Sequence, residues 1–119
     1  MPENLNALMR FMPAAVVMFD TEMRIIAASS KWLERYNFNL SDVVGKNHYD
    51  ILPSVSEEWK EVHKRCLAGA TERKDKDILY LPDGRIEYVK WEISPWRNEN
   101  GEIGGIILYS EIRTGMSKQ

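Results

Sequence analysis

His63 and Cys66 lie three residues apart in a segment with helical periodicity, and both side chains are common metal ligands. A His-x-x-Cys pair can present an imidazole and a thiolate to one ion from the same helical face. A structural site normally takes about four ligands, and the chain holds only 2 histidines and 1 cysteine. The sequence therefore predicts no metal site and favours a buried structural thiol at Cys66.

Catalytic patterns are not evident either. The sequence contains no Gly-x-Ser-x-Gly elbow and no glycine-rich phosphate loop, and no base-orienting partner is evident for Cys66. We therefore predict no catalytic residues and no enzymatic activity, and a small standalone enzyme is the least favoured of the functions considered.

Large aromatic side chains are the other candidates for a site. They could line a pocket between the helices and the sheet, although core packing explains most of them equally well. With His63 and Cys66 they form the predicted ligand-binding set: Trp32, Tyr36, Tyr49, Trp59, His63, Cys66 and Trp91.

The element that positions His63 and Cys66 is the longest predicted helix. It is expected to begin after Ser54, whose spacing to Glu57 fits a capping box, and to end near Gly69. Its inward stripe has helical spacing and comprises Trp59, Val62, His63, Cys66 and Leu67.

Three strands are predicted to follow as an antiparallel meander. The turn at Pro82-Asp83-Gly84 separates the first two strands, and the segment from Asn98 to Gly101 separates the last two. Val89, Trp91 and Ile93 share one face of the middle strand at period two. In the last strand, one face carries Ile106, Leu108 and Ile112, and the other carries Ile107 and Tyr109.

An apolar stripe near the N-terminus predicts a short amphipathic helix over residues 1–12, ended by Pro13. Because both faces of the last strand are apolar, its second face needs a cover. That cover is either this helix or a second copy of the chain. The predicted outer-face and dimer residues are Leu5, Leu8, Met9, Met12, Ile107 and Tyr109.

Composition limits the remaining classes. The chain has 119 residues, of which 44% are hydrophobic, so it can bury one core. Its 16 basic and 18 acidic residues give a net charge of -2, which predicts no nucleic-acid partner. No apolar run approaches the roughly 18 residues of a membrane span, so we expect no membrane insertion. A single cysteine and the lack of a signal pattern suggest the cytoplasm.

The element order is two strands, short helices, one longer helix and three strands, which predicts an α+β domain with helices on one face. Several segments in this order resemble the PAS sensory domains. PAAVVMFD, RIIAAS and WLERY are similar to the opening of that family, VGKN and DILP to its central helices, and WEISPW and GEIGGIILYSEIRT to its closing strands. The resemblance spans roughly residues 11–114.

This resemblance implies a five-stranded antiparallel sheet in the order 2-1-5-4-3, with short helices on one face. It also implies that residues 13–114 form a single sensor domain, with the N-terminal helix at 1–12 before it and a tail at 115–119 that leads to a missing output domain. That output would be a histidine kinase or diguanylate cyclase in the same polypeptide. The expected function is a non-catalytic, dimeric sensor that relays a ligand or partner signal.

The signal itself stays open at this stage. In haem-binding relatives an axial histidine lies where His63 lies, so a haem-based gas or redox sensor is the alternative function. The competing interpretation is a rim histidine that hydrogen-bonds to a neighbour. Light-sensing relatives place a reactive cysteine where this chain has His48, so a covalent flavin adduct is not expected. The cofactor is therefore unknown, with none or a small molecule favoured.

Overall fold

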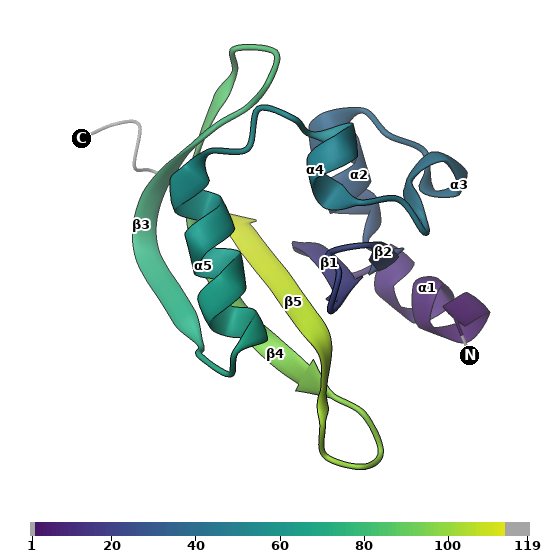
Figure 1. Cartoon of the computed structure of the whole chain (residues 1–119). Coiled ribbons are helices and arrows are strands. Elements are labelled where there is room, and N and C mark those ends of the chain that lie inside the picture. Colours follow the sequence, from purple (N-terminus) through teal and green to yellow (C-terminus); the bar gives the residue numbers. More distant parts are fainter. Residues whose placement is uncertain (1, 114–119) are drawn as a thin grey trace.

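The computed structural model describes residues 2–113. After an N-terminal helix, the chain forms two strands, then four helices and finally three longer strands (Figure 1). The elements are α1 (Pro2–Arg10), β1 (Ala15–Asp20), β2 (Ile25–Ala28), α2 (Ser30–Tyr36), α3 (Leu40–Val43), α4 (His48–Ile51), α5 (Glu57–Leu67), β3 (Glu72–Tyr80), β4 (Ile86–Arg97) and β5 (Ile103–Ile112). The predicted tail at 115–119 lies outside the described residues.

All five strands form one antiparallel sheet in the order β2-β1-β5-β4-β3, which confirms the predicted topology. Helices α2 to α5 gather on one face of the sheet, which we call the inner face. Helix α5 crosses in front of β4 and β5 (Figure 1). Strand β3 is one edge of the sheet, and its charged run from Glu72 to Lys76 is largely exposed, which is typical of a solvated edge strand.

Strand β5 lies in the centre of the sheet, and alternation along it separates two hydrophobic clusters. Leu108 is paired with Val17 of β1 and Ile93 of β4 and packs with the inner core. Tyr109 is paired with Val16 and packs with the outer cluster. The predicted assignment of alternate β5 residues to opposite faces is therefore confirmed.

A close backbone approach binds β5 to β1 at Gly105. A Cβ atom at this position would lie 1.7 Å from the carbonyl oxygen of Phe19, and the φ of Gly105 is +156°. The indole of Trp96 covers the neighbouring Gly104 and donates from Nε1 to the carbonyl oxygen of Phe19 at 2.8 Å. Only glycine leaves room for this crossing.

Helix α5 begins two residues later than predicted. Its N-cap is Ser56, whose hydroxyl accepts a hydrogen bond from the backbone N–H of Trp59 at 3.2 Å. The prediction of Ser54 was wrong because residues 53–54 form a turn, which delays the helix to the next serine. The positive-φ residue that follows the helix is Gly69, as predicted.

Helix α1 packs on the outer face of the sheet, opposite α2 to α5. Leu5 and Met9 contact the outer cluster, and the Asn6 amide bonds the carbonyl oxygen of Ile26 and the N–H of Ala28, each at 3.2 Å. The Asn6 amide thus satisfies backbone groups of edge strand β2. The helix ends at Arg10, before the predicted residue 12.

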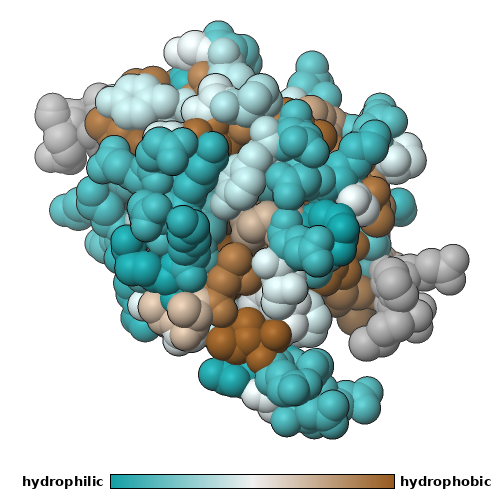
Figure 2. All heavy atoms as spheres, viewed as in Figure 1, coloured by the Kyte–Doolittle hydropathy of each residue, from teal (hydrophilic) through white to brown (hydrophobic). Residues whose placement is uncertain are grey.

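Two exposed side chains, Leu8 (74%) and Phe11 (82%), project away from the outer cluster beside α1. On the opposite side of the molecule, hydrophilic residues dominate the surface over α5, with a narrow hydrophobic strip beside it (Figure 2). Among residues 2–113, no helix combines the length and the apolar character needed to cross a bilayer.

Candidate functional site

A cluster of aromatic and imidazole rings fills the space between the inner face and helices α2, α4 and α5. Trp32 of α2 is 1% exposed, and its ring lies 5.1 Å from the ring of Tyr36 and 6.4 Å from that of His48, measured between centroids. The cluster, here called the inner ring cluster, comprises Phe19, Trp32, Tyr36, Phe38, His48, Tyr49, Trp59, His63 and Trp91.

His63 is held within this cluster by α5. Its Nδ1 atom lies 2.8 Å from the hydroxyl of Tyr49, and the Tyr49 and Trp59 rings stack near it with centroids 5.8 Å and 6.3 Å away. The predicted hydrogen bond to a neighbour is therefore confirmed, but His63 is buried in the core and not on the rim. Burial lowers the pKa of His63 to about 4 and raises that of Tyr49 to about 12.

His48 faces His63 from the first residue of α4. The two imidazole centroids lie 5.6 Å apart, and the Phe19 ring meets His48 edge-on at 4.9 Å. The Nδ1 atom of His48 is buried and has no hydrogen-bond partner in the part of the chain that the structure describes. Burial, and then the proximity of His63, lowers the pKa of His48 to about 3. A buried donor or acceptor without a hydrogen-bond partner costs free energy of folding, and a ligand or a water molecule can bind to such an atom.

Trp91 connects the inner ring cluster to edge strand β3. Its ring meets that of Trp59 at a centroid distance of 4.9 Å, and its Nε1 donates to Oδ2 of Asp77 at 2.8 Å. The wholly buried Cys66 donates its thiol to the carbonyl oxygen of Ile93 at 3.6 Å, and burial raises its pKa. The predicted burial of this thiol is confirmed.

A buried polar network ties α2 to the last two strands. The Arg35 side chain, 6% exposed, pairs with Glu87 of β4 at 2.9 Å and donates from Nη1 to the Ser110 hydroxyl of β5 at 2.7 Å. Arg35 lies one turn after Trp32 on α2, and Ser110 lies near the end of β5. Arg35 therefore connects α2, the helix that carries Trp32 and Tyr36, to β5 two residues before that strand ends.

The predicted ligand-binding residues meet around one hydrophobic core, although they come from three helices and a strand. The sequence patterns place neither His48 nor Arg35 in the site, although both are buried beside it. Alternation and spacing give no sign of either residue, because a buried polar residue stands out only once its neighbours are known. Two features of the sequence point to His48 as a site residue: it is next to Tyr49, and it is one of only 2 histidines in the chain.

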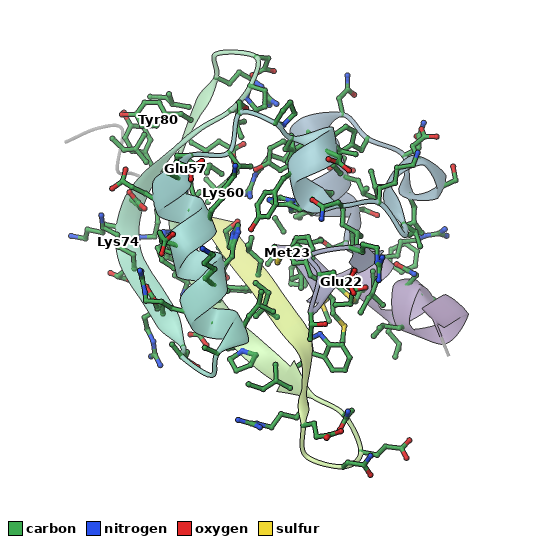
Figure 3. All side chains as sticks on the ribbon, viewed as in Figure 1. Glu22, Met23, Glu57, Lys60, Lys74 and Tyr80 are labelled. Carbon is green, nitrogen blue, oxygen red and sulfur yellow. The ribbon has the colours of Figure 1, made fainter. Side chains whose placement is uncertain are left out.

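Lys60 is a cation in contact with one ring of this site. It projects from α5 toward α4 (Figure 3), and its Nζ lies 5.3 Å from the centroid of the Tyr49 ring. Its ammonium group also pairs with Glu57 at 3.2 Å. Lys60 therefore makes a cation–π contact with a ring of the inner ring cluster.

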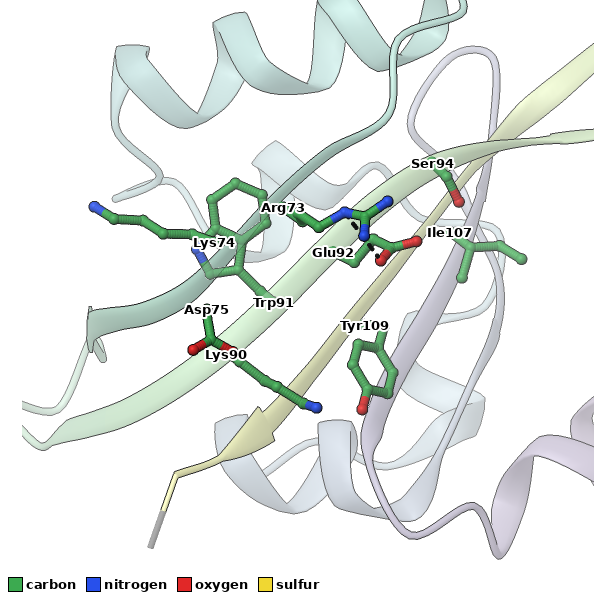
Figure 4. Close-up of a pocket in the computed structure, with 9 residues that line it drawn as sticks. All are labelled: Arg73, Lys74, Asp75, Lys90, Trp91, Glu92, Ser94, Ile107 and Tyr109. Carbon is green, nitrogen blue, oxygen red and sulfur yellow. Dashed lines mark ion pairs between the residues drawn. The ribbon is translucent and has the colours of Figure 1, made fainter. Parts of the chain in front are cut away.

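A groove lies on the outer face beyond α1. This groove of about 600 Å³ is floored by Ile107 and Tyr109 and edged by paired charges, including Arg73 and Glu92 at 3.7 Å (Figure 4). Of the predicted outer-face residues, Leu5, Met9, Ile107 and Tyr109 share one cluster, whereas Leu8 and Met12 are exposed outside it. Helix α1 covers only part of this face.

Metal binding gains no support from the geometry. Across residues 2–113, no group of three or more His, Cys, Asp or Glu side chains is arranged to hold an ion. The hydrogen bond between the Tyr49 hydroxyl and Nδ1 of His63, together with the enclosing rings, already occupies the surroundings of His63, so nothing in the geometry favours the haem alternative.

A model of the PAS fold matches residues 11–115. The solved structure of VqmA bound to DPO superposes with a TM-score of 0.75 at 18% identity, over 99% of this chain and 60% of that chain. A VqmA dimer from Vibrio cholerae has a TM-score of 0.75 at 19% identity, over 95% of this chain and 52% of that one. This chain thus spans between half and two thirds of the VqmA chains.

The PAS domain of Bordetella pertussis BvgS has a TM-score of 0.74 at 20% identity, over 98% of this chain and 88% of that chain. None of the curated proteins matches the sequence significantly.

Proposed function

The chain belongs to the PAS fold family, and from that premise we propose that it is a non-catalytic sensory domain that binds a small molecule within the inner ring cluster. The observation that carries the proposal is the unpaired Nδ1 of His48, buried among aromatic rings. Aromatic walls with a few convergent polar groups are typical of small-molecule sites. The binding residues we propose are Trp32, Tyr36, Tyr49, Trp59, His63, Cys66 and Trp91, with His48 added.

The bound state would be relayed through strand β5 to an output domain in the same polypeptide. Support for this comes from Arg35, which connects α2 to Ser110 near the end of β5. A small shift of α2 would move the Ser110 hydroxyl or break its bond to Arg35, and either change reaches the segment that leaves the sheet. A histidine kinase or diguanylate cyclase is the output proposed from the family resemblance.

We propose a homodimer formed through the outer face. Leu8 and Phe11 are exposed beside α1, and the groove over Ile107 and Tyr109 is next to the part of the sheet that α1 covers. Pairing two copies would remove both apolar surfaces from water. Leu8→Ser with Phe11→Ser should weaken the dimer in sedimentation without lowering the stability of each subunit. A change at Glu61, which is on the solvent side of α5, should leave association unchanged.

Native mass spectrometry tests the ligand site. The protein is measured as purified and after incubation with a small-molecule extract of bacterial cells, with DPO as a defined probe. We expect a noncovalent added mass on the wild type and on the outer-face control Glu92→Gln, and its loss from Trp59→Ala. An added mass retained by Trp59→Ala but lost from Glu92→Gln would place the ligand on the outer face and overturn this proposal. No added mass on the wild type under any condition would also contradict it.

A further inference from the structure

Both histidines of the chain are buried against each other between α4 and α5. His63 is 2% exposed and His48 is 6% exposed, and their ring centroids lie 5.6 Å apart. Nothing in simple packing requires two polar rings to meet here, since apolar residues would fill the same space without an unpaired nitrogen. The pair therefore needs a functional explanation.

The described surroundings of the pair are mostly aromatic and provide no carboxylate to pair with a positive charge. His48 is packed by Phe19 of β1, Trp32 of α2 and the adjacent Tyr49, and His63 by Tyr49 and Trp59. Three ionisable side chains of these elements have recorded contacts close to the pair: Tyr49 bonds to His63, the Tyr36 ring lies beside that of Trp32, and Lys60 lies over the Tyr49 ring. Cys66 lies one turn after His63 on α5.

None of the contacts recorded for the two imidazoles within residues 2–113 is to a carboxylate. A proton on either imidazole would therefore meet apolar rings, the other imidazole and the nearby ammonium group of Lys60.

We propose that protonation of the facing His48 and His63 side chains releases helices α4 and α5 from the sheet, so that the proton itself is a signal to which this domain responds. The inference rests on the proposed sensory function, because it names one signal for the same site. The closed form excludes the proton, whereas an open form exposes both imidazoles to water and accepts one proton on each.

The direction of the response follows from burial. Both folded-state pKa values lie below the ordinary value of 6.5, at about 3 for His48 and about 4 for His63. Opening is therefore insensitive to pH well above 6.5 and becomes easier as pH falls below it. Below pH 6.5, each histidine raises the equilibrium constant for opening about tenfold per pH unit. At pH 5, one histidine therefore raises this constant about 30-fold over its value at neutral pH, and two histidines raise it about 1,000-fold.

Cys66 is a natural reporter of this opening. It is the only cysteine, it is fully buried on α5, and it lies one turn after His63. Its reaction rate with 4,4′-dithiodipyridine is measured from pH 7.5 to pH 5 and divided by the rate of the urea-unfolded chain at the same pH. The division removes the effect of pH on the thiol itself. Urea unfolding at each pH gives the global stability, which distinguishes local opening from global unfolding.

We expect the relative reactivity of Cys66 to rise about 1,000-fold on acidification, with an opening free energy below that of global unfolding. The rise should disappear in His48→Gln/His63→Gln, in which the amide oxygen introduced by the second substitution can still accept a hydrogen bond from Tyr49. Circular dichroism checks the fold of this variant, and the wild-type slope alone remains decisive if the variant fails to fold.

Three outcomes would overturn the inference. The first is a reactivity that stays within threefold between pH 7.5 and 5. The second is a rise of only about 30-fold, which one histidine explains. The third is a reactivity that tracks global unfolding at every pH. If any of these occurs while native mass spectrometry still finds a bound small molecule, the sensory function survives and only the proton signal is rejected.

Discussion

The buried ion pair between Arg35 and Glu87 should contribute to the unfolding free energy mainly because it is buried, and less because of its charges alone. Their side chains are 6% and 19% exposed, and Arg35 also holds the Ser110 hydroxyl. Arg35→Met leaves the Glu87 carboxylate largely buried with no cation beside it. Removing one partner of a buried pair costs about 3–5 kcal/mol. Because Glu87 keeps some contact with water, we expect the lower value, about 3 kcal/mol of unfolding free energy.

Urea unfolding at pH 7.5 measures this loss, and the chain offers a matched control. Arg24 pairs with Asp20 at 3.1 Å on the surface, where the two side chains are 49% and 31% exposed, so Arg24→Met should change stability far less. The double variant Arg35→Met/Glu87→Met should regain most of the loss, because no ion is then buried alone. The reasoning is refuted if Arg35→Met and Arg24→Met lose equal stability, or if the double variant is no better than Arg35→Met.

Three further predictions concern the core. Gly105→Ala should lower the unfolding free energy by at least about 3 kcal/mol, because the added Cβ would overlap the Phe19 carbonyl. The control Gly101→Ala lies at an open turn position and should lower it by about 1 kcal/mol. Similar melting temperatures of the two variants would contradict this prediction. Trp91→Phe should cost about 2 kcal/mol through loss of the bond to Asp77, and the same substitution should cost less in the Asp77→Ala background, where that bond is already absent; equal losses in urea in the two backgrounds would argue against the bond. Finally, because the pKa values of His48 and His63 are lowered, global stability should fall by about 4 kcal/mol from pH 7 to pH 5, and a variant without histidine should show a flat profile.

The sequence was sufficient for the strands and for the division of residues between the two faces of β5. Period-two patterns are local, and turn residues such as Gly84 and Gly101 mark where each strand ends. The order of the strands came from the family resemblance and not from periodicity, because alternation does not say which strands pair.

The candidate site was only partly predictable. The aromatic residues were identified by size and spacing, but the network of Arg35, Glu87 and Ser110 joins residues separated by up to 75 positions. No local pattern encodes such a contact. Helix boundaries depended on which of two serines formed the cap, and Leu8 is exposed because α1 presents Leu5 and Met9 to the sheet.

The central claim is that the inner ring cluster is coupled to the end of β5. Backbone amide NMR spectra of Trp32→Phe test it most directly, because Trp32 is fully buried in the cluster one turn before Arg35. The account predicts that the resonances of Glu111 and Ile112 move in the wild-type background and stay in place when Ser110→Ala removes the bond to Arg35. Unmoved β5 resonances in the wild-type background, or equal shifts in both backgrounds, would contradict the coupling.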